Sequence, residues 1–136
     1  MTRHAIRRRL EGFLAARTAG DDLVAAYLFG SVARGDDGAG SDVDVAVLYR
    51  RDPPPTFEAL PLRLEGDIER LLGRRAEVVA LNLAPVDLCV RVLRDGVVIL
   101  DRDRPARIAF EVRTRNVWFD LQPVLRTYRR TAPRPR

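Results

Sequence analysis

The chain has 136 residues, of which 46% are hydrophobic and 32% charged, a composition typical of one folded domain rather than of a disordered protein. Its single cysteine, Cys89, excludes a disulfide scaffold within the chain, and no apolar run approaches the roughly 18 residues that a membrane span needs. We therefore expect a cytoplasmic protein without a membrane partner. We predict a single domain over residues 1–130, followed by a disordered tail over 131–136.

The charge is unevenly distributed along the chain. All 24 basic residues are Arg, and the formal net charge is +5. Residues 1–20 carry a net charge of +4 and residues 101–136 carry +6, while residues 21–100 between them carry −5. The basic ends keep nucleic acid as a minor candidate partner, but the acidic middle argues against non-specific nucleic-acid binding as the main role.

The first third of the chain predicts a helix followed by two strands. Ile6, Leu10, Phe13 and Leu14 have helical spacing, which predicts a helix over 2–18. A short apolar run predicts a buried strand over 23–29. The small, polar, glycine-rich segment 31–41 predicts a turn with at most a short helix, and the alternation that follows predicts a strand over 42–49.

The rest of the chain alternates helices with strands. Prolines 53–55 predict a loop, and the next helix is expected over 62–72, ended by Gly73. A strand over 76–82, a helix from Pro85 to Gly96 and a strand over 97–100 follow. A long helix is expected over 105–129, with a kink or break at Pro123. Its apolar set is expected to be Ile108, Val112, Trp118, Leu121 and Leu125.

One segment combines a glycine-rich turn with paired carboxylates. The strand over 23–29 ends in Gly30-Ser31, ten residues follow, and Asp42 and Asp44 then open the next strand. Strand alternation places the two carboxylates on one face, about 6.6 Å apart along the chain, with Val43, Val45 and Val47 directed into the core. Carboxylates this close repel each other, and Mg²⁺ relieves such a conflict by binding one or two carboxylates together with phosphate oxygens.

The turn before the aspartates suits a phosphate. Glycine allows the backbone to turn sharply and to approach a ligand, and the Ser31 hydroxyl and the N–H groups of a following helical turn donate to anions. Arg34 is the one basic residue between Gly30 and Asp44 in the sequence. The chain has no Lys, so the segment is not a Walker A loop.

The segment GSVARGDDGAGSDVDVAVL resembles the GS-x10-DxD signature of the polymerase-β-like nucleotidyltransferase superfamily. The short length and the later stretch AEVVALNLAPVDLCVRVLRDGVVIL resemble its minimal nucleotidyltransferase branch, the antitoxin partners of HEPN-domain toxins. The resemblance implies an α+β fold with a mixed sheet flanked by helices. It also implies two Mg²⁺ ions and ATP as the nucleotide substrate.

The resemblance assigns roles to residues of this chain. Asp42, Asp44 and Glu77 are the expected metal ligands and catalytic carboxylates; family members usually have Asp where this chain has Glu77. Gly30, Ser31, Arg34 and Ser41 are the expected nucleotide-binding residues, although Ser41 alone also suits a turn or cap.

The function that the resemblance implies is that of an antitoxin. It transfers AMP from ATP to a tyrosine of a HEPN-domain RNase toxin, with which it forms a hetero-oligomer. Two alternatives stay open from the sequence. One is a small-molecule nucleotidyltransferase of the aminoglycoside type that completes its pocket by dimerisation. The other is a toxin-binding module without catalysis.

Overall fold

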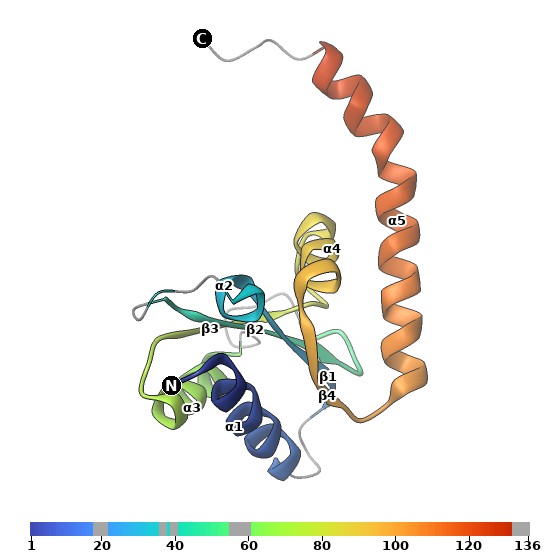
Figure 1. The fold of residues 1–136 in the computed structure, drawn as a ribbon. Helices are drawn as coiled ribbons and strands as arrows, with labels where there is room; N and C mark the ends of the chain where they lie inside the picture. Colours follow the sequence, from blue (N-terminus) through green and yellow to red (C-terminus); the bar gives the residue numbers. More distant parts are fainter. Residues whose placement is uncertain (18–21, 36–37, 39–40, 55–60, 132–136) are drawn as a thin grey trace.

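Five helices and four strands follow one another in the computed structural model, which describes residues 1–17, 22–35, 38, 41–54 and 61–131 (Figure 1). In chain order they are α1 (Arg3–Ala16), β1 (Leu23–Phe29), α2 (Gly30–Arg34), β2 (Val43–Tyr49), α3 (Leu62–Leu72), β3 (Ala76–Ala80), α4 (Val86–Asp95), β4 (Val97–Asp101) and α5 (Arg104–Thr131). The predicted tail over 131–136 lies outside the described residues, apart from Thr131 at the end of α5.

The four strands form one mixed sheet in the order β3-β2-β1-β4. β1 runs antiparallel to both β2 and β4, and β2 runs parallel to β3. β2 is therefore an inner strand with a neighbour on each side. The predicted α+β class with a mixed sheet and a long C-terminal helix is confirmed.

Helices cover both faces of the sheet (Figure 1). α1 and α3 pack on one face, where the alternate residues Val43, Val45 and Val47 of β2 are fully buried as predicted. α4 and the first part of α5 pack on the other face, against Ala46 and Leu48. Each buried Val or Leu side chain contributes about 1.5–3 kcal/mol, so this double covering fixes the register of β2 and the face onto which Asp44 points.

The first helix follows its predicted spacing. Ile6, Leu10 and Leu14 are fully buried on the sheet, and Phe13 packs beside them with partial exposure. The Oγ1 atom of Thr2 accepts a hydrogen bond of 3.1 Å from the backbone N–H of Ala5 and so caps the N-terminus. α1 ends at Ala16, two residues before the predicted end.

The third strand is shorter than predicted. β3 ends at Ala80, not at residue 82, because the side chain of Asn82 replaces the next pair of strand hydrogen bonds. Its Oδ1 accepts from the Tyr49 N–H at 2.8 Å and its Nδ2 donates to the Tyr49 carbonyl at 2.9 Å. The predicted strand over 42–49 likewise begins one residue later, at Val43.

The long helix differs from its prediction in two respects. Of the kink or break predicted at Pro123, the break does not occur: α5 continues through Pro123, although proline cannot donate to the carbonyl of residue 119, and its outer part curves (Figure 1). The predicted apolar set also mixes two sides of the helix: Ile108 and Val112 are exposed, and the buried residues are Phe110 and Thr114. Ala106 and Phe110 contact the sheet face that α4 covers.

Among the described residues, no helix combines the length and the apolar character that crossing a membrane requires.

Candidate active site

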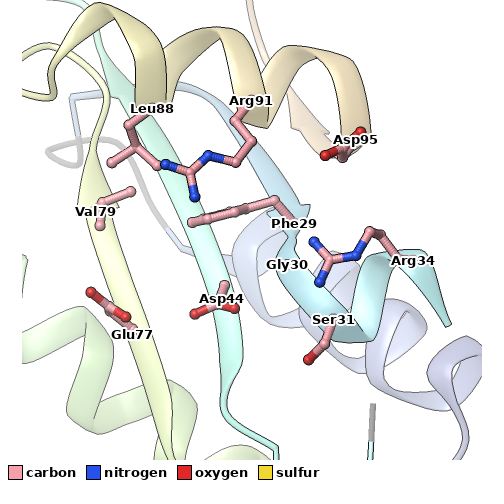
Figure 2. A pocket seen from close by; sticks show the side chains of 10 residues that line it. All are labelled: Phe29, Gly30, Ser31, Arg34, Asp44, Glu77, Val79, Leu88, Arg91 and Asp95. Atoms are coloured by element: carbon pink, nitrogen blue, oxygen red, sulfur yellow. The ribbon is translucent and has the colours of Figure 1, made fainter. Parts of the chain in front are cut away.

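A cavity of about 400 Å³ opens on the sheet face that α4 covers, between α2 and α4. We call it the α2–α4 pocket (Figure 2). Its lining comes from β1, α2, β2, β3 and α4: Phe29, Gly30, Ser31, Arg34, Asp44, Glu77, Val79, Leu88, Arg91 and Asp95. The pocket thus gathers five of the seven predicted site residues, and Ser41 and Asp42 are not part of its lining.

Asp44 and Glu77 lie side by side on two parallel strands. They are register partners in the β2–β3 pairing, so their side chains leave the sheet on the same face. Figure 2 shows both carboxylates directed into the pocket. Asp44 is half-buried and Glu77 is exposed. The structure thereby brings together the predicted second aspartate and the predicted third carboxylate.

The charge of Asp44 is poorly compensated. Burial raises the pKa of its carboxyl above the ordinary value, the negative charges of Glu77 and Asp42 raise it further, and Arg34 opposes them. A cation bound between these groups would remove the repulsion, and hard carboxylate oxygens are the ligands that Mg²⁺ prefers. The donor chemistry of this part of the pocket therefore fits a divalent cation.

The described residues do not form a complete protein cage for a metal. In the parts of the chain that the structure describes, no three His, Cys, Asp or Glu side chains gather closely enough to hold an ion. A carboxylate pair that leaves positions open is the usual arrangement for Mg²⁺, which keeps several waters and binds substrate phosphates.

Gly30 allows Asp44 to lie directly against the turn between β1 and α2. Its φ is +75°, in the left-handed region, and a Cβ atom built on it would lie 2.0 Å from Oδ2 of Asp44. Both the backbone conformation and the space therefore require glycine. Phe29, the preceding residue, pairs with Asp44 in the β1–β2 register, which fixes this contact.

Of the other residues predicted to bind the nucleotide, two line the pocket and one does not. Ser31 and Arg34 line the pocket from α2. Ser41 does not line it: its Oγ accepts a hydrogen bond of 2.9 Å from the N–H of Gly38, as a turn residue would. Asp42 is exposed and precedes β2, outside the lining, but its charge still acts on Asp44.

No sequence motif pointed to the α4 side of the pocket. Leu88, Arg91 and Asp95 have the i, i+3, i+7 spacing of one helix face, and all three line the pocket. Figure 2 shows the guanidinium of Arg91 directed over Phe29 toward the carboxylates. Arg34 and Arg91 both help to lower the pKa of Asp95, after its main partner Arg94. This helix-face spacing, without knowledge of the fold, could not indicate which cavity the face would line.

Comparison with known proteins places this geometry in a family. The family model described as polymerase beta, nucleotidyltransferase matches residues 15–105, which include every lining residue of the pocket. The chain belongs to this family. No curated protein matches it.

Solved nucleotidyltransferase structures are similar to this chain over most of its length. A minimal nucleotidyltransferase is 35% identical with a TM-score of 0.56, and the match covers 71% of this chain and 95% of that one. A chain of a toxin–antitoxin complex with AMP-PNP is 24% identical with a TM-score of 0.73, covering 89% and 93%. A third similar chain comes from the solved complex of the tri-AMPylated Shewanella oneidensis HEPN toxin with MNT antitoxin. It is 22% identical with a TM-score of 0.69, and the match again covers 89% of this chain and 93% of that one.

Proposed function

We propose that this nucleotidyltransferase transfers AMP from ATP to a tyrosine of a HEPN-domain toxin and so acts as the antitoxin of the pair. The observation that carries the proposal is the contact of Gly30 with Asp44, beside Glu77, in a pocket that Ser31 and Arg34 also line. It combines paired carboxylates for a metal-bound nucleotide with donors for its phosphates.

The chemistry is a displacement at phosphorus. The acceptor oxygen forms a bond to the α-phosphorus of ATP, the bond from that phosphorus to the bridging oxygen breaks, and pyrophosphate leaves. Two Mg²⁺ ions, held by Asp42, Asp44 and Glu77, would supply charge stabilisation at the attacking and leaving oxygens. The three carboxylates orient that charge, and Glu77 is also the candidate to take the proton of the acceptor hydroxyl.

The cationic side chains of the pocket come from two helices. Arg34 on α2 and Arg91 on α4 both line the pocket, each from its own helix (Figure 2). Guanidinium groups bind phosphate oxygens through paired hydrogen bonds. We assign the β- and γ-phosphates to Ser31, Gly30 and Arg34, and we assign Arg91 to the same triphosphate from the α4 side.

The acceptor is proposed to be a protein because the described residues after β4 form one helix, which packs on α4 and contributes no residue to the pocket lining. The solved toxin–antitoxin complexes, including one with an AMPylated HEPN toxin, support this choice. A hetero-oligomer with the toxin and a cytoplasmic location, where ATP is present, complete the proposal.

The test is a transfer assay with ATP labelled at the α-phosphate, Mg²⁺ and the HEPN-domain protein that this proposal names as the acceptor. We expect label on the toxin, located on tyrosine by mass spectrometry, and loss of the toxin's RNase activity. Asp42→Asn with Asp44→Asn should abolish labelling, whereas Asp87→Asn, the same change on α4 outside the pocket lining, should not.

The same assay separates the alternatives. Label transferred to an aminoglycoside and not to the toxin would establish a small-molecule enzyme. Absence of any transfer, with toxin neutralisation that survives the double Asp→Asn change, would establish a binding module without catalysis. Either result would refute AMP transfer to the toxin.

A further inference from the structure

α5 carries a stripe of mostly apolar residues, and the two halves of this stripe have different environments. Its residues follow one another at alternating spacings of four and three. We call this set the α5 stripe: Phe110, Thr114, Val117, Leu121, Val124 and Tyr128. At 100° per residue all six lie within about 40° of one line along the helix. This is the a/d spacing of a helix that packs against another helix.

The first half of the stripe is covered by the chain itself. Phe110 and Thr114 are buried, and α5 packs there against α4 and β1. The second half is exposed: Val117 is 45% exposed and Val124 61%. Figure 1 shows why, because α5 continues well beyond the end of α4 and of the sheet.

The charge around the exposed half indicates what covers it. Residues 113–131 contain five Arg and one acidic residue, Asp120. A second copy of α5 would bring these Arg side chains against one another, which opposes self-association. Nucleic acid would satisfy the charge but would leave the heptad-spaced apolar residues in water. An apolar helix surface rimmed by Asp and Glu satisfies both features.

We propose that the exposed half of the α5 stripe docks a helix of the acceptor protein whose apolar surface has an acidic rim. This inference rests on the proposed function for the identity of the acceptor. α5 and α4 lie on the same face of the sheet, the face on which the α2–α4 pocket opens. A helix bound along the exposed half would therefore hold the acceptor on the pocket side of the molecule.

The test compares two variants of the full chain with changes on different sides of α5. Val117→Ser with Val124→Ser alters the stripe, and Phe119→Ser alters an apolar residue that is 76% exposed and lies about 180° around the helix from the stripe. Affinity for the HEPN-domain protein is measured by calorimetry without ATP, at low and high salt, together with ATP affinity and the mass of the free chain in solution.

We expect the double variant to bind the HEPN-domain protein at least about tenfold more weakly, as for residues at the centre of an interface. ATP affinity and the mass of the free chain should not change, Phe119→Ser should bind as the wild type does, and high salt should weaken wild-type binding. Unchanged binding by the double variant, an equal loss with Phe119→Ser, or a dimer that only the double variant dissociates would overturn the docking assignment.

Failure of the proposed function gives a different pattern. A wild-type chain that binds the HEPN-domain protein through the stripe but transfers no AMP would refute the transfer and leave the docking surface established. Normal AMP transfer by the double variant, with undiminished affinity for the HEPN-domain protein, would refute the docking surface and leave the transfer established.

Discussion

At the scale of single residues, the contact between Gly30 and Asp44 determines the shape of the pocket floor. Gly30→Ala would place a methyl group 2.0 Å from Oδ2 of Asp44 and would keep a φ of +75° that alanine disfavours. The carboxylate must then move. We expect AMP transfer to fall about 100-fold, the loss that a small misplacement of a reacting group causes, and stability to fall by about 1–2 kcal/mol.

Gly73 provides the matched control for this change. Its φ is +64°, and nothing lies within 4 Å of a Cβ built on it. Gly73→Ala should therefore lose stability by a similar amount while keeping its transfer rate. Equal transfer rates for the two variants, measured with saturating ATP, would show that the Gly30 contact does not position Asp44.

We expect the negative charge of Asp44 to lower the stability of the folded chain, although AMP transfer requires that charge. Its folded pKa is raised, mainly by burial and then by Glu77, so the folded state binds the proton more tightly than the unfolded state. The favourable contribution is present below the unfolded pKa of about 3.9 and is lost as pH rises through the folded pKa.

Asp44→Asn should therefore raise the melting temperature of the metal-free chain at pH 7, and the gain should disappear as the pH falls below the unfolded value. Transfer should fall by about two orders of magnitude or more, as for the loss of a principal electrostatic group. Mg²⁺ with ATP should raise the melting temperature of the wild type and have less effect on the variant. A variant less stable than the wild type at pH 7 would contradict this account.

Arg91 was identified from the structure and not from the sequence, and its assignment to the triphosphate can be tested alone. Arg91→Gln removes a charge that points over the pocket carboxylates. We expect the KM for ATP to rise about tenfold, the usual effect of one charged hydrogen bond. Arg63→Gln, the same change on α3 at the other face of the sheet, should leave the KM unchanged.

At the scale of elements, a polar cluster holds the first part of α5 on the sheet. The Tyr27 hydroxyl donates to Oε2 of Glu111 at 2.9 Å, and Arg107 forms ion pairs with Glu111 at 2.5 Å and with Asp101 of β4 at 3.0 Å. Burial and Glu111 raise the pKa of Tyr27 well above its ordinary value. The cluster therefore connects β1, β4 and α5 through the buried Tyr27 and through the partly exposed side chains of Arg107 and Glu111.

This cluster predicts a loss of stability in alkali. Because the folded pKa of Tyr27 is raised, the unfolded chain loses the proton first, so the stability contributed by the neutral phenol falls as pH rises above about 10. Tyr27→Phe should lower stability by about 1 kcal/mol at pH 7 and show a smaller further loss between pH 9 and 11 in urea titrations. An equal alkaline loss in both proteins would assign it to other groups.

Periodicity predicted the type of each long element because burial on one side leaves a repeating pattern in the sequence. It was wrong where two apolar sides share one helix: Ile108 and Val112 belong to the exposed side of α5, and Phe110 to the buried one. The break at Pro123 does not occur, so the α5 ribbon runs without interruption past α4 (Figure 1). The early end of β3 depends on the Asn82 side chain, which no local pattern indicates.

The candidate site was predictable where its residues are close in sequence. Gly30, Ser31 and Asp44 form a spaced motif, and the parallel pairing of β2 with β3 brings Glu77 to Asp44. Leu88, Arg91 and Asp95 were missed because only the packing of α4 over the sheet brings them to the same pocket. Ser41 was grouped with the motif by sequence distance, yet its hydroxyl serves the turn at Gly38.

At the scale of the whole molecule, the chain divides into a two-faced sheet domain and an extension of α5 beyond it (Figure 1). The buried residues that hold α5 on the domain, Phe110 and Thr114, belong to its first half. The last part of α5, from Pro123 onward, carries exposed residues such as Val124. Folding of the domain and positioning of the pocket should therefore depend little on the end of α5.

A chain that stops after Gln122 tests this division. It keeps the buried part of α5 and the cluster around Arg107, so we expect stability within about 1 kcal/mol of the full chain, the range of changes to exposed positions. The m-value in urea should change only slightly, since little surface is removed from the folded core. A loss of several kcal/mol, or a broad transition, would mean that the part of α5 after Gln122 stabilises the domain directly.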